Sequence, residues 1–166
     1  EEIAEVSSLV KEVQLPLRKL PSRKEALELL DEFKKEYEFL KSQGASPSEL
    51  RVAWTKVDGA LDVLERIQLG ASDNEITSTV QAIKINDIVI IGVPGELHSH
   101  IALMLKEYGS KLGKRVVVVG YANDYLGYIL PTEEYRKQNY EAIISQFNDE
   151  GAIKMTDSLK LLIKEI

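Results

Sequence analysis

The fold is decided by residues 88–119, which read IVIIGVPGELHSHIALMLKEYGSKLGKRVVVV. The nearly unbroken apolar run at 88–93 predicts a strand that is buried on both faces, and Pro94-Gly95 turns the chain at its end. A helix is then expected over 96–112, before a second strand at 115–119. This order favours a right-handed parallel crossover, which places the loops after both strands at the same edge of one sheet.

The residues on either side extend this unit. Residues 76–85 predict a further strand, and Asn86-Asp87 is typical of a tight hairpin turn into the strand at 88. Near the end of the chain, apolar residues recur at helical spacing and predict a short amphipathic helix over 156–166. They are Leu159, Leu162, Ile163 and Ile166.

The first 70 residues are predicted to be helical. Two capping-box patterns, at Ser22–Glu25 and at Ser46–Glu49, each precede an amphipathic stretch that ends at a glycine. Two such helices joined by a short loop form a helical hairpin. The predicted fold is therefore α/β, with an N-terminal helical hairpin, a mixed sheet containing a strand–helix–strand crossover, and a C-terminal helix.

The opening residues EEIAEVSSLV contain no methionine and show apolar residues at spacings of three and four, which predicts a helix that is already under way. This start favours a chain that is the C-terminal piece of a longer protein. An intact small protein with a processed methionine is the alternative. We treat 1–166 as a single unit, with a helical part at 1–70 and an α/β part at 76–166 that bears the site.

Composition excludes several classes of function. A net charge of −6 and a pI near 5.1 argue against general affinity for nucleic acid or for an anionic membrane. The absence of cysteine excludes disulfides, thiol chemistry and zinc–thiolate sites. No apolar run approaches the ~18 residues of a membrane span, so no transmembrane segment is expected. The compartment stays open, and the surface suits either the cytoplasm or export.

An unusual density of phenols follows the second strand of the crossover. Five of the seven tyrosines lie between residues 115 and 141. A buried strand that ends in a loop rich in polar aromatics is where an α/β fold usually carries its chemistry. The five are Tyr121, Tyr125, Tyr128, Tyr135 and Tyr140.

This segment resembles the neutral/alkaline non-lysosomal ceramidases, a family of zinc-dependent amidases that hydrolyse N-acyl sphingosine. The resemblance covers roughly residues 76 to 145 and suggests a minimal bacterial-type relative, of which this chain is the C-terminal portion of the catalytic domain. Its first motif is Val93-Pro94-Gly95-Glu96. Its second comprises Gly120, Asn123, Tyr125, Tyr128, Thr132, Glu133, Glu134, Tyr135, Gln138, Tyr140 and Glu141.

The resemblance implies roles for particular residues. Glu96 and Tyr128 match the family's zinc ligands, and Tyr140 matches the tyrosine whose hydroxyl stabilises the oxyanion of the tetrahedral intermediate. Asn123 and Tyr125 are candidates for substrate binding. Without the resemblance, Glu96 could instead complement a helix dipole, Tyr128 could lie on a half-exposed strand, and Tyr140 could pack against Tyr135.

The family's zinc also takes two histidine ligands, and its further histidine and arginine residues likewise come from the N-terminal half. The two histidines here, His98 and His100, match no ligand position, and on a helix they would project about 200° apart. We read them as solvated helix residues, although either could border the cleft. We therefore expect this chain to supply half of a zinc site and to be inactive alone, with an N-terminal segment of the same protein as its partner.

The function expected from this resemblance is hydrolysis of a lipid amide, N-acyl sphingosine or a relative, in sphingolipid metabolism. The segment Leu97-His98-Ser99-His100 replaces the threonine and small residues of relatives, which leaves a different amide or an ester open as substrate. A non-catalytic α/β interaction module derived from the family is the alternative. A nucleotide-binding domain is disfavoured because the Pro-Gly-Glu turn lacks a phosphate-loop glycine pattern.

Overall fold

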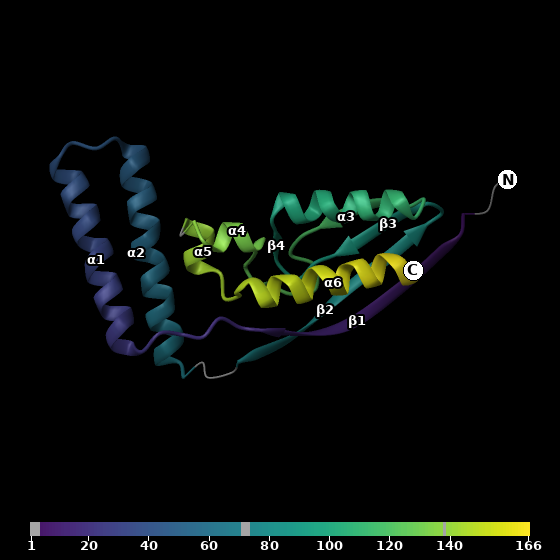
Figure 1. The fold of residues 1–166 in the computed structure, drawn as a ribbon, viewed down its shortest axis with the longest axis horizontal. Coiled ribbons are helices and arrows are strands. Elements are labelled where there is room, and N and C mark those ends of the chain that lie inside the picture. Colours follow the sequence, from purple (N-terminus) through teal and green to yellow (C-terminus); the bar gives the residue numbers. More distant parts are fainter. Residues whose placement is uncertain (1–3, 71–73, 138) are drawn as a thin grey trace.

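The computed structural model describes residues 4–70, 74–137 and 139–166, and its centre is a four-stranded mixed sheet (Figure 1). β1 pairs antiparallel with β2, β2 pairs antiparallel with β3, and β3 lies parallel to β5. The predicted hairpin turn joins β2 to β3, and Asn86 within it adopts a φ of 54°. The strands are β1 (Val6–Pro16), β2 (Glu75–Ile85), β3 (Ile88–Gly92) and β5 (Arg115–Val119).

The predicted parallel crossover is confirmed, but its helix begins later than expected. α3 spans Ser99–Lys111, and Glu96–Leu97 instead forms a short strand, β4, that pairs in parallel with β6 (Tyr128–Ile129). The backbone N–H of Glu96 donates to the carbonyl of Gly127 at 2.8 Å, and that of His98 donates to Ile129 at 3.0 Å. These bonds across some thirty residues hold the chain extended at Glu96, where local pattern alone favours a helix start.

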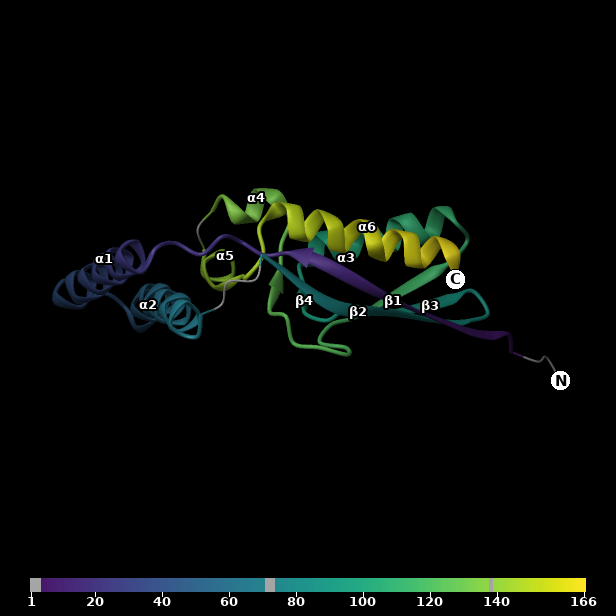
Figure 2. The same ribbon diagram turned by 90° about the horizontal axis from the view of Figure 1, so that it is seen from below.

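Two helices cover one face of the sheet. α3 lies over β5, and α6 (Asp149–Glu165) lies across β1 to β3 beside α3 (Figure 2). α6 begins before the predicted start near residue 156, because Asn148 caps it by accepting the N–H of Gly151.

The prediction that 88–93 is buried on both faces is wrong: Val89 and Ile91 are fully buried on the helix-covered face, whereas Ile90 is only half-buried.

The helix predicted for the opening residues is also wrong where the structure describes them, because β1 occupies Val6–Pro16; residues 1–3 lie outside the described residues. β1 pairs with β2 along all eleven residues, and its alternate side chains Leu9, Val13 and Leu15 turn toward the core. Val6 and Val10, which suggested helical spacing, are 64% and 58% exposed. The strand forms because pairing with β2 provides hydrogen-bond partners for the backbone N–H and C=O groups of these residues. A local sequence pattern cannot reveal this distant partner.

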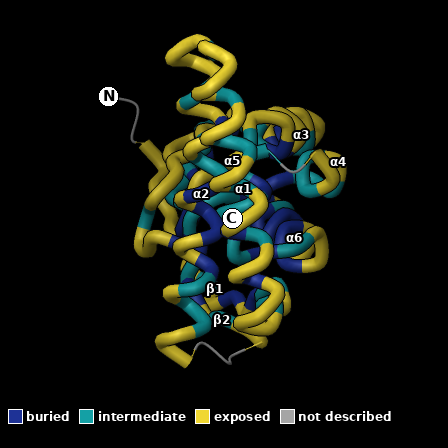
Figure 3. Tube along the Cα trace, turned by 90° about the vertical axis from the view of Figure 1, so that its left-hand side faces the viewer, coloured by how far each residue is buried: buried dark blue, intermediate teal, exposed yellow. Residues whose placement is uncertain are grey.

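The predicted helical hairpin is present as α1 (Arg23–Ser42) and α2 (Pro47–Gln68), and both capping boxes form. It extends from one end of the sheet and remains exposed over much of its length, whereas buried segments gather beneath α6 (Figure 3). α2 packs against α5 (Tyr140–Ile144), while α4 (Thr132–Tyr135) contacts α5 and α6. No helix in the described ranges combines the length and the apolarity that crossing a bilayer requires.

Close approach of α2 to α5 depends on Gly59. A Cβ added at this position would lie 2.5 Å from Cγ2 of Ile143 and 2.9 Å from Cγ2 of Ile144. The glycine therefore lets the helical hairpin dock directly on the segment that carries Tyr140. This contact connects the N-terminal helices to the candidate site.

Leu159→Ala tests the packing of α6 on the sheet. Leu159 is fully buried, so the truncation should leave a cavity and lower the free energy of unfolding by about 3 kcal/mol. Urea unfolding followed by circular dichroism measures this change. Leu161→Ala on the same helix is the control, since Leu161 is 46% exposed and should change stability by less than about 1 kcal/mol. Equal losses in the two variants would contradict the orientation of α6.

Candidate active site

The loop that follows β5 folds back onto the Pro94-Gly95 turn that follows β3. The N–H groups of Tyr121 and Leu126 donate to the carbonyls of Gly95 and Pro94, at 3.1 and 2.7 Å. The N–H of Ala122 donates to the carbonyl of Val93 at 2.9 Å. These bonds form a clasp between residues 93–97 and 119–129. The two loops therefore meet at one edge of the sheet, as the crossover predicts.

The clasp leaves no room for a side chain at its centre. A Cβ on Gly95 would stand 2.5 Å from the carbonyl oxygen of Gly127, which belongs to the backbone and has little freedom to move. Gly127 itself has a φ of 70°, a conformation that glycine adopts without strain. Both glycines are thus needed for β4 and β6 to approach within hydrogen-bonding distance.

Glu96 and Tyr128 are directly opposite each other in the β4–β6 pair. Residues paired in this way project to the same side of a sheet, so the carboxylate and the phenol are neighbours. The hydroxyl of Tyr121 donates to Oε2 of Glu96 at 2.6 Å. Within the described residues, no protein donor bonds to Oε1 of Glu96, so this oxygen is free to accept another partner.

Tyr140 joins this group from α5. Its ring meets that of Tyr128 edge-on, with 6.1 Å between ring centroids and an interplanar angle of 73°. The side chain of Asn139 caps the helix by accepting the N–H of Ala142 at 3.0 Å, which fixes the first turn of α5 on which Tyr140 stands. The three residues assigned by resemblance, Glu96, Tyr128 and Tyr140, therefore lie close together in the fold.

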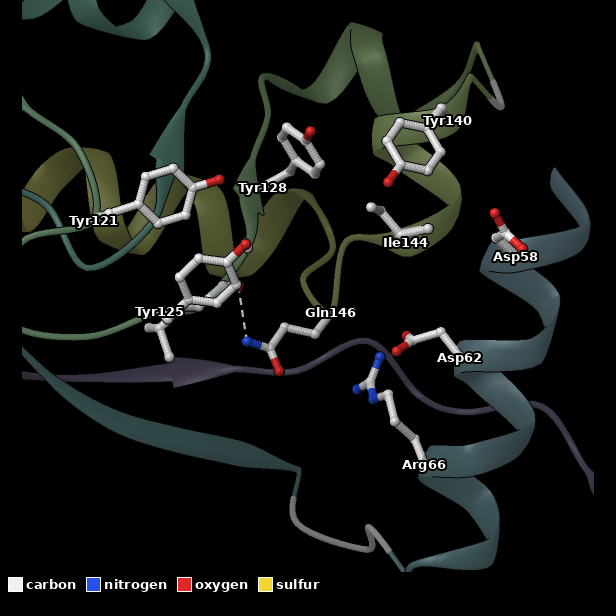
Figure 4. Close-up of a pocket in the computed structure, with 11 residues that line it drawn as sticks. Asp58, Asp62, Arg66, Tyr121, Tyr125, Tyr128, Tyr140, Ile144 and Gln146 are labelled. Carbon is white, nitrogen blue, oxygen red and sulfur yellow. Dashed lines mark hydrogen bonds between the residues drawn. The ribbon is translucent and has the colours of Figure 1, made fainter. Parts of the chain in front are cut away.

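A cavity of about 430 Å³ opens between these tyrosines and α2 (Figure 4). Its tyrosine wall comprises Tyr121, Tyr125, Tyr128 and Tyr140, with Gln146 below them. The opposite wall comprises Asp58, Asp62 and Arg66, which recur every four residues along one face of α2. The volume lies in the range of small-molecule sites.

Sequence reasoning missed both the α2 wall and the role of Tyr121. The i, i+4, i+8 spacing of Asp58, Asp62 and Arg66 was a usable signal for one polar helix face, but nothing in it specified what this face would meet. Tyr121 was visible as part of the tyrosine-rich stretch. Its contact with Glu96, which is 25 residues away, depends on the clasp.

The other residues considered from sequence lie at or outside the rim. Tyr125 lines the cavity while remaining 77% exposed, whereas Asn123 is exposed and is not part of the lining. His98 caps α3, its Nδ1 accepting the N–H of His100 at 3.3 Å, and neither histidine lines the cavity. Gln138 lies outside the described residues.

The surroundings of Tyr121 and Tyr128 favour the protonated phenol. The hydrogen bond to Glu96 raises the pKa of Tyr121, because ionisation would break it. Partial burial raises the pKa of Tyr128, and the negative charge of Glu96 acts in the same direction. A cation bound between Glu96 and Tyr128 would reverse this balance and favour the phenolate.

The donor set fits part of a zinc site. A carboxylate and a phenol on paired strands offer two oxygen ligands to one ion, and Oε1 of Glu96 is available for it. Zinc sites in proteins usually contain three or four protein ligands. The described part of the chain holds no group of three or more histidine or acidic side chains able to bind a metal. Further ligands would therefore have to come from outside this group.

Residues 60–150, more than half of the chain, match the family described as neutral/alkaline non-lysosomal ceramidase, N-terminal. The matched range includes Glu96, Tyr128 and Tyr140 and extends into α2. It is longer at both ends than the resemblance seen in the motifs. No curated protein matches the chain significantly.

Two solved structures match the chain, and one of them supports a similarity of fold. The neutral ceramidase from Pseudomonas aeruginosa superposes over 96% of this chain with a TM-score of 0.52 and 19% identity, and the match covers 28% of that structure. A ceramidase complexed with C2 matches 54% of this chain and 14% of its own length, with a TM-score of 0.46 and 22% identity. The chain thus spans less than a third of either protein.

Gly95→Ala tests whether the clasp holds the site together. The added methyl group collides with the backbone of Gly127, so we expect a loss of about 1–3 kcal/mol of stability and weaker pairing of β4 with β6. Hydrogen exchange measures the pairing directly, through the amides of Glu96 and Leu126. In the control Gly44→Ala, which meets open space in the helical hairpin, these two amides should keep their protection. Unchanged protection in Gly95→Ala would refute the role of the clasp.

Proposed function

The chain belongs to the neutral/alkaline non-lysosomal ceramidase family, and from this we propose that it forms part of a zinc-dependent, ceramidase-like hydrolase. The bond cleaved is an amide in N-acyl sphingosine or a related lipid. The observation that carries the proposal is the proximity of three residues: Tyr128 and Tyr140 line one cavity, and Glu96 is paired with Tyr128 beside it. A degenerate relative would have no reason to keep three polar side chains together.

In this proposal Glu96 and Tyr128 supply two of the zinc ligands. Their paired positions on β4 and β6 keep both oxygens on one side of a rigid backbone unit. The other two ligands are histidines on an N-terminal segment of the same protein. We call the assembly that contains all four ligands the complete protein, whether they lie on one polypeptide or two.

Other residues of this chain have roles in the proposed reaction besides binding zinc. When bound, zinc would polarise the amide carbonyl and lower the pKa of a water molecule toward ~7. The Tyr140 hydroxyl donates a hydrogen bond to the oxygen that gains negative charge as the carbonyl carbon becomes tetrahedral. Its edge-on contact with Tyr128 limits the directions in which this hydroxyl can point. The tyrosine wall and α2 flank the space in which the amide would bind.

Glu96→Ala tests the metal assignment. Removing a charged ligand should take the zinc content of the complete protein, measured by elemental analysis after purification, from near one per molecule to near zero. Glu107→Ala, at an exposed position of α3 away from the cavity, should retain zinc. Stoichiometric zinc in Glu96→Ala would refute the ligand role. Absence of zinc from the unaltered complete protein would instead favour the non-catalytic module.

Tyr140→Phe tests the oxyanion role. Loss of one preorganised donor should lower kcat about 10²- to 10³-fold on an N-acyl sphingosine substrate, with zinc content unchanged. Tyr108→Phe serves as the control, because Tyr108 packs against the core away from the cavity. A wild-type rate in Tyr140→Phe would remove this residue from the mechanism.

A further inference from the structure

At the edge of the cavity, a short hydrogen bond connects the hydroxyl of Tyr121 to the carboxylate of Glu96. The phenolic O–H donates to Oε2 at 2.6 Å, which is short for a hydroxyl and characteristic of a charge-assisted bond to a carboxylate. We propose that Tyr121 is a positioning residue that orients Glu96 for zinc, a role that rests on the proposed function above. By occupying Oε2, it leaves Oε1 to bind the ion.

Glu96 needs such a partner because its own surroundings constrain it little. The residue is exposed, and a glutamate has three side-chain torsions that water leaves free to rotate. The backbone at β4 is fixed by its bonds to Gly127 and Ile129, but these bonds do not reach the carboxylate. Among the described residues, the Tyr121 hydroxyl is the side-chain donor that holds it.

Tyr121 is itself held both at its backbone and at its ring. Its N–H donates to the carbonyl of Gly95, the residue immediately before Glu96, so the donor and the acceptor share one backbone frame. Its ring stacks on Tyr125, with 4.8 Å between centroids and an interplanar angle of 21°. This stacking is visible at the edge of the cavity, where the two rings lie one above the other (Figure 4).

The loop below the stacked pair is anchored to the sheet. Oδ2 of Asp124 accepts a hydrogen bond from the buried hydroxyl of Ser78 on β2 at 2.9 Å, and Oδ1 accepts the N–H of Tyr125 at 2.8 Å. Asp124 therefore connects the base of Tyr125 to a rigid strand. A donor that stands on a fixed loop restricts its acceptor more than a donor on a mobile one.

The backbone at Tyr121 carries strain that calls for an explanation. Its φ of 54° is in the left-handed region, where a residue with a bulky side chain is about 1–2 kcal/mol less favourable than glycine. A glycine would adopt this conformation without strain, but the glycine of this turn is residue 120, and the left-handed residue is Tyr121, which carries a side chain. Strained residues of this kind persist where the surrounding structure enforces them, and they cluster at functional sites. The hydrogen bond to Glu96 gives the Tyr121 side chain a function at such a site.

Groups that orient a metal ligand contribute strongly to metal affinity, and their loss typically weakens binding about 10- to 100-fold. Tyr121→Phe removes the hydroxyl and keeps the ring that stacks on Tyr125. The zinc dissociation constant of the complete protein, measured by competition with a chromophoric chelator, should rise about 10- to 100-fold. The urea midpoint of the zinc-free protein should stay unchanged, because the lost bond is exposed to solvent.

The matched control is Tyr37→Phe. Tyr37 also lies against an aromatic ring, that of Trp54, but it stands in the helical hairpin away from the cavity. Its substitution should leave the zinc dissociation constant within about twofold of wild type. An equally small change in Tyr121→Phe, with wild-type protein that binds zinc, would overturn the positioning role and leave the proposed function standing. Wild-type protein that binds no zinc would overturn both.

X-ray absorption at the zinc edge separates positioning from direct ligation. At saturating zinc, Tyr121→Phe should show the same number and type of ligand atoms as wild type, because only the second contact of Glu96 is lost. Disappearance of an oxygen ligand would show that Tyr121 binds the ion itself and would overturn the inference. Together with the dissociation constant, this measurement gives a readout that does not depend on turnover.

Discussion

The structure depends on the contact between Gly95 and the backbone of Gly127. Because this contact has no side chain in it, the turn after β3 and the loop after β5 approach closely enough for β4 and β6 to pair. That pairing puts Glu96 opposite Tyr128, and the same clasp places Tyr121 over Glu96. A steric constraint of a few atoms thus determines where a carboxylate and two phenols meet. Without it, they would lie on separate loops of one sheet edge.

A second glycine completes the cavity from the other side. Gly59 allows α2 to lie against α5, so that the helical hairpin forms a wall opposite the tyrosines and carries Asp58, Asp62 and Arg66 there. The hairpin is therefore more than a structural appendage to the sheet. The two walls come from different elements of the chain, and the glycine at the contact between α2 and α5 sets how closely they approach. The cavity is a consequence of two close backbone approaches rather than of any one motif.

Two of the wrong predictions about secondary structure, those for residues 6–13 and for Glu96–Leu97, have the same origin. Residues 6–13 show apolar residues at helical spacing, and Glu96 follows a turn that commonly starts a helix. In both places a distant strand supplies backbone partners: β2 for β1, and β6 for Glu96–Leu97. The backbone hydrogen bonds of a helix join residues four apart, so a short stretch of sequence can predict a helix without reference to the rest of the chain. A strand becomes the better solution only when its partner is in place.

The sequence by itself determined the elements whose signals are local or strongly periodic. The capping boxes at Ser22 and Ser46, the hairpin at Asn86-Asp87 and the parallel crossover follow from residue types and spacing. It also identified the family motifs that contain Glu96, Tyr128 and Tyr140. Tertiary structure alone decided that β1 is a strand, that Tyr121 bonds to Glu96, and that α2 forms a wall of the cavity. These contacts join residues far apart in the chain, and their stability comes from pairing and close packing that no short window of sequence contains.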